Sequence, residues 1–258
     1  MIWDPLHREL DQWAEQSRVA RLWLRDDDAV SPSPALARLA SVTEDIGAVI
    51  AVIPAPADDR LAAFVTRQTR WRVAVHGWSH ANHAPPDGKK QELGAHRPAA
   101  ETLAELTRGF TKLSALLGDR LLPMLVPPWN RIDASLLPEL RGCGFEAVSV
   151  FGPAQAQAPI PMINTHVDLI DWHGGRGGRN PAVLVAEIVR ELVRRRHAAD
   201  EPLGILSHHL VNDETAFGFI GELLSFTGGH SACRWLGVGE LGLNGDRQSV
   251  ARDEGAGE

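Results

Sequence analysis

Short runs of apolar, β-branched residues alternate along the chain with longer stretches in which apolar residues recur every three or four positions. The short runs are almost wholly apolar, which is typical of parallel strands covered on both faces. Seven runs are expected to be strands: Ala20–Arg25, Ala48–Ile53, Arg72–His76, Leu122–Val126, Ala147–Phe151, Val167–Ile170 and Leu203–Ser207. Their alternation with helical patterns predicts an α/β fold, either a β/α barrel or a doubly wound sheet.

Helix start signals stand between these runs. Ser33 is of the residue type that caps a helix, and Pro34 suits a first turn. Apolar residues at helical spacing follow Pro98, Asn180-Pro181 opens another helical pattern, and Asp213 can cap one more. We find no internal repeat and no dividing linker. A barrel domain is therefore expected over residues 1–241, followed by a loose, polar, Gly-rich tail over 242–258.

Composition narrows the class of protein. The chain has 258 residues, 44% of them hydrophobic, and a formal charge of -7 with scattered basic residues, which argues against a nucleic-acid partner. No apolar run approaches the roughly 18 residues that span a bilayer. Cys143 and Cys233 form no CxxC motif, and the N-terminus lacks the pattern of a signal peptide. We expect a cytoplasmic globular protein, and the pattern assigns no oligomeric state.

Three consecutive carboxylates follow the first predicted strand. Asp26, Asp27 and Asp28 come directly after an apolar run, at the kind of strand end where α/β proteins build their active sites. Adjacent carboxylates repel one another unless a cation or a shared proton compensates. The run is therefore either a metal or proton-transfer site or a solvated acidic turn.

Histidines follow two further strands. His76-Gly77-Trp78-Ser79-His80 leaves the strand that ends at His76, and its H-x3-H spacing places both imidazoles on one face if the segment turns helically. Two histidines and a carboxylate can bind one metal and leave positions open for water and substrate. His208-His209 ends a later strand, where a histidine can act as a general acid or can simply be a buried, hydrogen-bonded residue.

The order of these motifs resembles that of the NodB-type polysaccharide deacetylase family. The matching motifs, which span most of the chain, are Asp27-Asp28, His76-x3-His80, a Pro-Pro-aromatic loop at 127–129, Asp168-x-x-Asp171-Trp172 and Leu206-x-His208. The resemblance implies a single-domain, distorted (β/α)7 barrel. It also implies one divalent metal ion, usually zinc, and hydrolysis of an N-acetyl or related amide by a metal-activated water.

The resemblance further implies a role for each matched residue. Asp28, His76 and His80 would be the metal ligands. The metal lowers the pKa of the water and polarises the amide carbonyl. Asp27 would take the proton from the attacking water, and His208 would protonate the departing amine.

Two further motifs would complete the site. Pro128, Trp129 and Asn130 would contact the substrate, with a backbone N–H near Trp129 holding the oxyanion. Asn130 could instead serve only the chemistry of its turn. Asp171 and Trp172 would support the site from the fourth motif.

The register of the aspartates has two solutions. Asp27 and Asp28 are the preferred pair because the small Ala29 then stands after the ligand, where the family has glycine; the alternative makes Asp26 the base and Asp27 the ligand. In the preferred register Asp26 would pair with Arg25 or Arg131. Likewise His208 is preferred to His209 as the acid because it directly ends the strand-like run.

One departure from the family concerns an arginine. The third motif of the family begins with an arginine that orients the base aspartate, whereas this chain has Val126 at that position. Arg131 or Arg97 could supply the missing group from elsewhere.

These residues lead to three hypotheses of function. The first is a metal-dependent hydrolase of a carbon–nitrogen amide bond that removes the acetyl group of an N-acetylated sugar or small conjugate, with a small-molecule or oligosaccharide substrate. The second is a non-catalytic barrel that binds a sugar or metabolite and retains a vestigial site. The third is a hydrolase of a cyclic amide.

Overall fold

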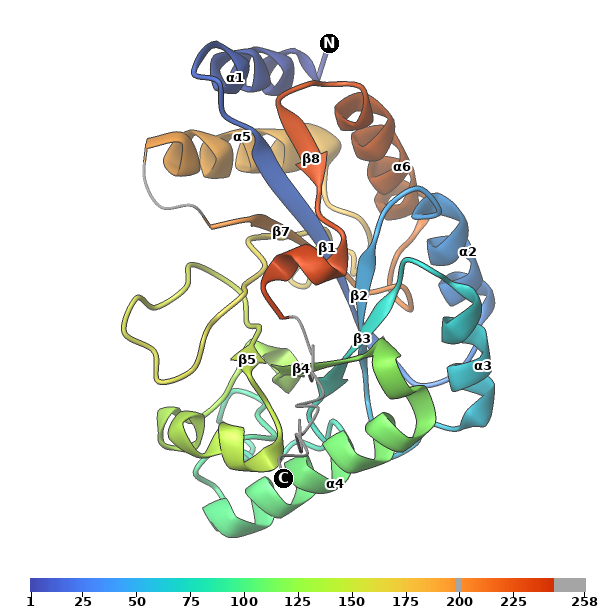
Figure 1. Cartoon of the computed structure of the whole chain (residues 1–258), viewed down its shortest axis with the longest axis vertical. Coiled ribbons are helices and arrows are strands. Elements are labelled where there is room, and N and C mark those ends of the chain that lie inside the picture. Colours follow the sequence, from blue (N-terminus) through green and yellow to red (C-terminus); the bar gives the residue numbers. More distant parts are fainter. Residues whose placement is uncertain (198–200, 244–258) are drawn as a thin grey trace, which may run out of the picture.

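A curled sheet of parallel strands forms the centre of the computed structural model, which describes residues 1–197 and 201–243 (Figure 1). The strands follow the order β5-β4-β3-β2-β1-β7-β6, and β8 pairs with β1. All of these pairings are parallel. The strands are β1 (Ala20–Ala29), β2 (Ala48–Val52), β3 (Arg72–His76), β4 (Leu121–Val126), β5 (Ala147–Val148), β6 (Val167–Asp168), β7 (Leu203–Ser207) and β8 (Cys233–Trp235).

Helices lie around the outside of this sheet (Figure 1). The α-helices are α1 (Asp4–Glu15), α2 (Pro34–Val42), α3 (Asp59–Arg67), α4 (Ala99–Leu117), α5 (Pro181–His197) and α6 (Glu214–Gly228). Short 3-10 segments are η1 (Gly118–Arg120), η2 (Pro128–Asn130), η3 (Ala134–Cys143) and η4 (Val238–Leu241). Ser33 caps α2 by accepting from the Leu36 N–H, and Asp213 caps α6 by accepting from the Ala216 N–H. Both caps match the sequence-based expectation.

All seven expected strands are present, and two α-helices and one strand in the described residues are additional. The first strand is longer than expected, because β1 continues through the aspartates to Ala29, whereas β5 and β6 have only two residues each. Helices α1 and α3 and strand β8 were not expected. Each of the two helices buries three apolar side chains at helical spacing, so their pattern could have been read from the sequence, whereas β8 is only three residues long and gives no clear alternation. Leu243 is buried, and the rest of the expected tail, residues 244–258, lies outside the described residues.

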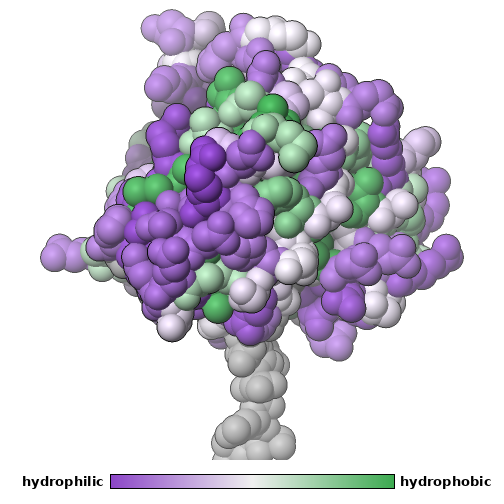
Figure 2. All heavy atoms as spheres, turned by 90° about the horizontal axis from the view of Figure 1, so that it is seen from above, coloured by the Kyte–Doolittle hydropathy of each residue, from purple (hydrophilic) through white to green (hydrophobic). Residues whose placement is uncertain are grey.

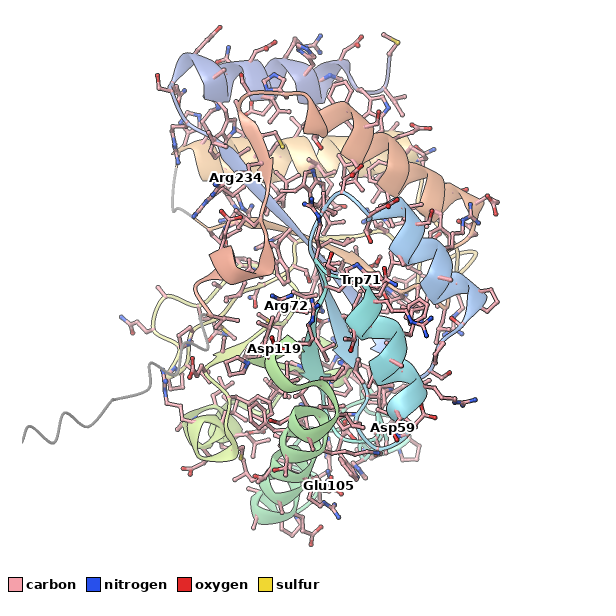
Figure 3. The ribbon with its side chains drawn as sticks, turned by 45° about the vertical axis from the view of Figure 1, so that its right-hand side comes forward. Asp59, Trp71, Arg72, Glu105, Asp119 and Arg234 are labelled. Carbon is pink, nitrogen blue, oxygen red and sulfur yellow. The ribbon has the colours of Figure 1, made fainter. Side chains whose placement is uncertain are left out.

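Trp71 fixes the start of β3 to two of the helices. The side chain is 2% exposed, and its indole Nε1 donates to the hydroxyl of Thr43 at 3.2 Å, just after α2. Its ring lies 6.3 Å from that of Phe64 in α3. Figure 3 shows Trp71 on the inner side of these helices. Buried aromatic area of this kind anchors β3, whose other end carries His76.

The sheet register gathers the predicted site residues at one edge. Since every strand is parallel, the carboxyl ends of the strands meet at the same edge of the sheet. Asp26 of β1 lies opposite Ser207 of β7, and His76 of β3 lies opposite Val126 of β4. The aspartates, the H-x3-H segment and the His208-His209 pair therefore leave the barrel at a common end.

One face of the molecule is largely polar. The face in Figure 2 is dominated by hydrophilic side chains, with hydrophobic ones in separate small groups. No helix in the described part of the chain is long and apolar enough to cross a membrane.

Candidate active site

The three consecutive aspartates at the end of β1 have separate sets of partners. Successive residues of a strand point to opposite faces of the sheet, so Asp26 and Asp27 diverge. Asp28 then adopts a left-handed conformation with φ of 73°, which Asp tolerates better than most residues. Because the alternation is broken there, Asp28 lies beside the histidines that follow β3.

Asp28, His76 and His80 form a group that fits a divalent metal ion. Asp28 Oδ1 lies 3.1 Å from Nε2 of His76 and 3.3 Å from Nε2 of His80. One ligand atom from each residue lies within 4.8 Å of the others. The His76 Nδ1–H donates to the carbonyl of Val126 at 2.9 Å, so its Nε2 is left to face a cation. Two imidazoles and one carboxylate leave positions open for water and substrate.

Electrostatics at this group suit a bound cation. Burial alone would raise the pKa of the Asp28 carboxyl, but hydrogen bonding to His76 and the neighbouring imidazoles hold that pKa well below its usual range. Burial and the proximity of His76 lower the pKa of His80, which keeps it neutral at pH 7. For His76, burial is outweighed by Asp28, which raises the pKa.

The H-x3-H segment brings its imidazoles together without a helix. Gly77 and His80 have positive φ values of 60° and 59°, so the expected helical turn is absent. The two rings nevertheless lie 5.1 Å apart. The predicted helical turn between the two histidines was therefore wrong, but their side chains do converge.

Asp27 is held by an arginine from its own strand. The Arg25 guanidinium donates from Nε to Asp27 Oδ1 at 2.9 Å and from Nη2 to Oδ2 at 3.0 Å, and both side chains are almost fully buried. Nη1 donates to the carbonyl and the hydroxyl of Ser149, and Nη2 also donates to Asn130 Oδ1 at 2.6 Å. A paired, fully hydrogen-bonded guanidinium of this kind fixes the orientation of the carboxylate.

Arg25, rather than Arg131 or Arg97, is the arginine that contacts Asp27. Arg131 donates to the backbone carbonyl of Lys90, and Arg97 pairs with Glu105, so neither alternative named from the sequence contacts Asp27. The expectation that Asp26 pairs with Arg25 or Arg131 was wrong, because Arg25 binds Asp27 and Arg131 binds Lys90. Residues two apart on a strand share a face, and this places Arg25 beside Asp27 instead.

Removing Arg25 should cost far more stability than removing Arg131. We expect Arg25→Met to lower the free energy of unfolding by about 3–5 kcal/mol, because Asp27 would be left as an uncompensated buried charge. Arg131→Met removes a partly exposed guanidinium that does not pair with a buried carboxylate, and should change the free energy of unfolding by about 0.5 kcal/mol or less. Urea unfolding of both variants measures the difference, and equal losses would contradict the assignment of Arg25.

Asp26 is hydrogen-bonded to Ser207 at the end of β7 and to His209 just after it. It is fully buried, its Oδ2 accepts from the Ser207 hydroxyl at 2.5 Å and the His209 N–H at 2.9 Å, and its Oδ1 lies 2.5 Å from His209 Nδ1. Burial lowers the pKa of His209, but Asp26 outweighs it and raises that pKa. These contacts favour Asp27 and Asp28 as the reactive pair and leave His208 as the histidine that faces Asp27.

His208 lies opposite Asp27 and among residues of the fourth motif. Its Nε2 is 4.0 Å from Asp27 Oδ2, and its ring meets that of Trp172 edge-on at 4.7 Å. Trp172 Nε1 in turn donates to Asp168 Oδ2 at 2.8 Å. Burial raises the pKa of Asp168, against the opposing charge of His208. Asp171, predicted to support the site, instead accepts from the N–H of Gly174 in a surface turn, so the fourth-motif carboxylate near His208 is Asp168.

The loop after β4 lies beside the candidate metal ligands Asp28, His76 and His80. Trp129 has a φ of 55° and its ring lies 4.2 Å from that of His80. Asn130 has a φ of 56°, and its side-chain Oδ1 accepts from Arg25 Nη2, so this side chain belongs to the Arg25 network. Pro128 is buried, with its ring close to where a side chain on Gly77 would project. These three residues thus lie around the candidate site.

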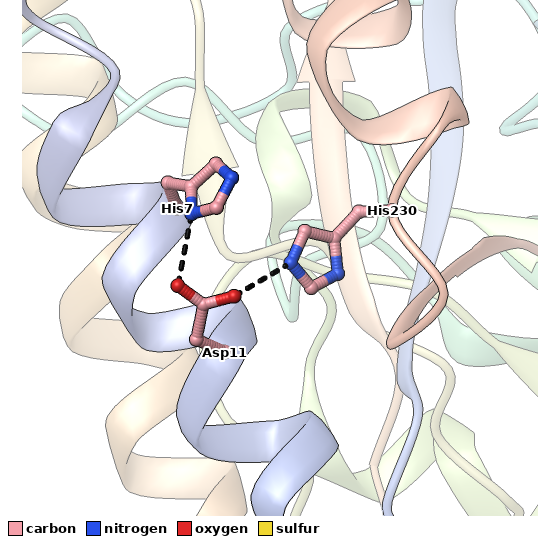
Figure 4. A group of neighbouring side chains, drawn as sticks. All are labelled: His7, Asp11 and His230. Atoms are coloured by element: carbon pink, nitrogen blue, oxygen red, sulfur yellow. Dashed lines mark hydrogen bonds and ion pairs between the residues drawn. The ribbon is translucent and has the colours of Figure 1, made fainter.

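A second group of metal-ligand types lies at the far end of β1 (Figure 4). Asp11 lies 2.9 Å from Nδ1 of His7 and 3.4 Å from Nε2 of His230. The N–H of Ala232 donates to His230 Nδ1 at 3.2 Å, so Nε2 of a neutral His230 carries the proton and points it at Asp11. This arrangement links α1 to the segment before β8 and is poorly suited to a metal ligand.

Comparison with known proteins agrees on the fold. No family model and no curated protein matches the sequence. Among solved structures, a Mycobacterium smegmatis protein assigned as a polysaccharide deacetylase has a TM-score of 0.64 at 16% identity, over 87% of this chain and 89% of that one. A cobalt-bound family 4 acetyl xylan esterase from Clostridium thermocellum has a TM-score of 0.51 at 14% identity, over 86% and 89%.

A further structural neighbour is a pseudoenzyme of the CE4 family. It comes from Bacillus anthracis and has a TM-score of 0.57 at 14% identity, over 86% of this chain and 65% of that one. Together these structures confirm the single-domain, distorted (β/α)7 fold of the NodB-type polysaccharide deacetylases that the motif order predicted.

Proposed function

We propose that this protein is a metal-dependent hydrolase that removes the acetyl group from an N-acetylated sugar or small conjugate. The observation that carries the proposal is the convergence of the Asp28, His76 and His80 group with Asp27 and His208, which lie 4.0 Å apart beside it. A base and an acid beside a metal group are the parts that amide hydrolysis requires.

Each residue has a distinct task in this proposal. Asp28, His76 and His80 would hold the divalent ion, which supplies Lewis acidity toward water and the amide carbonyl. Asp27 accepts a proton as the water oxygen bonds to the carbonyl carbon, and Arg25 keeps its carboxylate in place. When the C–N bond breaks, a proton from His208 goes to the amine nitrogen, so that acetate and a free amine leave.

Zinc is the proposed ion, and a saccharide the proposed substrate. Imidazole and carboxylate ligands suit zinc, although the same set also accepts other first-row metals. The structural neighbour from Mycobacterium smegmatis, assigned as a polysaccharide deacetylase, supports an N-acetylated sugar. Trp172, 38% exposed beside His208, offers an aromatic face that a sugar ring could stack on.

Release of acetate is the direct test. Protein loaded with Zn²⁺ should release equal amounts of acetate and free amine from N-acetylglucosamine oligomers or small N-acetyl conjugates, and chelation should stop the reaction. No acetate from these substrates, together with opening of a cyclic amide to a single product that carries both the new amine and the new carboxylate, would favour cyclic-amide hydrolysis. Metal-loaded protein that binds these substrates without turnover would favour the non-catalytic barrel, for which the pseudoenzyme neighbour is a precedent.

A further inference from the structure

Glu92 is a fully buried carboxylate that contacts the backbone of the histidine turn. Its Oε1 accepts from the N–H of Ser79 at 2.8 Å, from the Ser79 hydroxyl at 3.1 Å and from the N–H of Ala81 at 3.4 Å. Its Oε2 accepts from the N–H of Trp78 at 3.1 Å. The carboxylate is 0% exposed, so the turn between His76 and His80 closes around it.

The backbone of this turn needs such an acceptor. Gly77 and His80 take positive φ values, and the segment between them makes no helical ladder that would satisfy its N–H groups. A buried carboxylate is costly unless it is hydrogen-bonded, and the N–H groups of this turn are the donors that satisfy Glu92. The fit is close, because a Cβ on Gly77 would stand 2.0 Å from Glu92 Oε2 and 2.6 Å from Pro128 Cγ.

Glu92 itself is fixed by the chain on both sides of it. Just before it, Gln91 donates its N–H to Asn82 Oδ1 at 2.9 Å and accepts from the N–H of His83 at 3.0 Å. Just after it, Leu93 is 1% exposed and its carbonyl accepts from the N–H of Asp133 at 2.8 Å. The carboxylate therefore acts as a fixed template on which the turn is folded.

We propose that Glu92 is a positioning residue that sets the spacing and direction of His76 and His80 for a divalent cation. The inference rests on the proposed function and adds a residue outside the matched motifs. It follows from the geometry: one carboxylate holds Trp78, Ser79 and Ala81, which occupy the interior of the H-x3-H segment and the position after it. Preorganised ligands lose less freedom when the cation binds.

Zn²⁺ affinity of the full chain tests this role. Glu92→Gln keeps the shape of the side chain but turns one oxygen into a donor, which opposes an N–H of the turn; Glu92→Ala removes the acceptor. We expect both variants to bind Zn²⁺ about 10- to 100-fold more weakly in competition calorimetry. In the metal-free variants the N–H groups of Trp78 and Ser79 should also exchange faster with solvent. Glu9→Gln, a buried glutamate that pairs with Arg196, is the matched control.

The outcomes separate this role from the proposed function. Weaker Zn²⁺ binding in Glu92→Gln at an unchanged circular dichroism spectrum, with Glu9→Gln at wild-type affinity, supports the role of Glu92. Zn²⁺ affinity within about threefold of wild type in folded Glu92 variants would overturn that role alone. Wild-type protein that binds no Zn²⁺ would overturn the proposed function and this inference together. If Glu92→Ala does not fold, Glu92→Gln decides.

Discussion

Replacing Asp28 with asparagine should abolish both metal retention and turnover. The side chain supplies the only carboxylate of the group and lies 3.1 and 3.3 Å from the two imidazoles. Its loss should therefore weaken Zn²⁺ binding by more than the roughly 100-fold expected for loss of a hydrogen-bond partner of a ligand. Elemental analysis of purified protein and calorimetry measure the effect.

Asp171→Asn is the control for this change. Asp171 is an aspartate of the fourth motif that hydrogen-bonds Gly174 in a surface turn, so its amide variant should keep its metal and its activity. Retention of a full equivalent of Zn²⁺ by Asp28→Asn would contradict the ligand set. Equal loss in the two variants would point to unfolding instead, which thermal melts detect.

Replacing Asp27 with asparagine should separate chemistry from metal binding. The amide cannot accept a proton, so kcat should fall by about 10²- to 10⁴-fold, the usual contribution of a positioned general base. Metal content should stay at the wild-type level because Asp27 contacts Arg25 and not the imidazoles of the metal group. Steady-state acetate release, together with elemental analysis, checks both halves.

A comparison with Asp26→Asn decides the register. Asp26 pairs with His209 and Ser207, so Asp26→Asn should lower the free energy of unfolding. The kcat of its folded fraction should fall less than the kcat of Asp27→Asn. A larger fall in kcat for Asp26→Asn, with Asp27→Asn losing metal, would restore the alternative register.

The fold and the main members of the site could be predicted because their signals are local. Parallel strands buried on both faces are written as short apolar runs, so β3 and β7 have the predicted bounds. Once those strands are parallel, the residues after them must share one edge of the sheet. That is why Asp28, His76 and His80 could be expected to converge before any distance was known.

The supporting groups could not be predicted because their signals are not local. Arg25 reads as one more strand residue, and only the alternation of faces along β1 shows that it meets Asp27 rather than Asp26. Glu92 stands in an irregular segment without periodicity, and its role depends on a turn whose positive φ values leave no trace in the H-x3-H spacing. Asp168 and Asp171 are both in the fourth motif, and tertiary packing alone places Asp168 near His208.

The pairing of Arg25 with Asp27 also bears on how the site responds to motion. Both residues belong to β1, but the same guanidinium also donates to Ser149 and, at 2.6 Å, to Asn130 Oδ1. A displacement of the 127–130 loop would therefore be transmitted through Asn130 to the arginine that orients Asp27. The proton acceptor and the loop that carries Trp129 are thus linked through a single side chain.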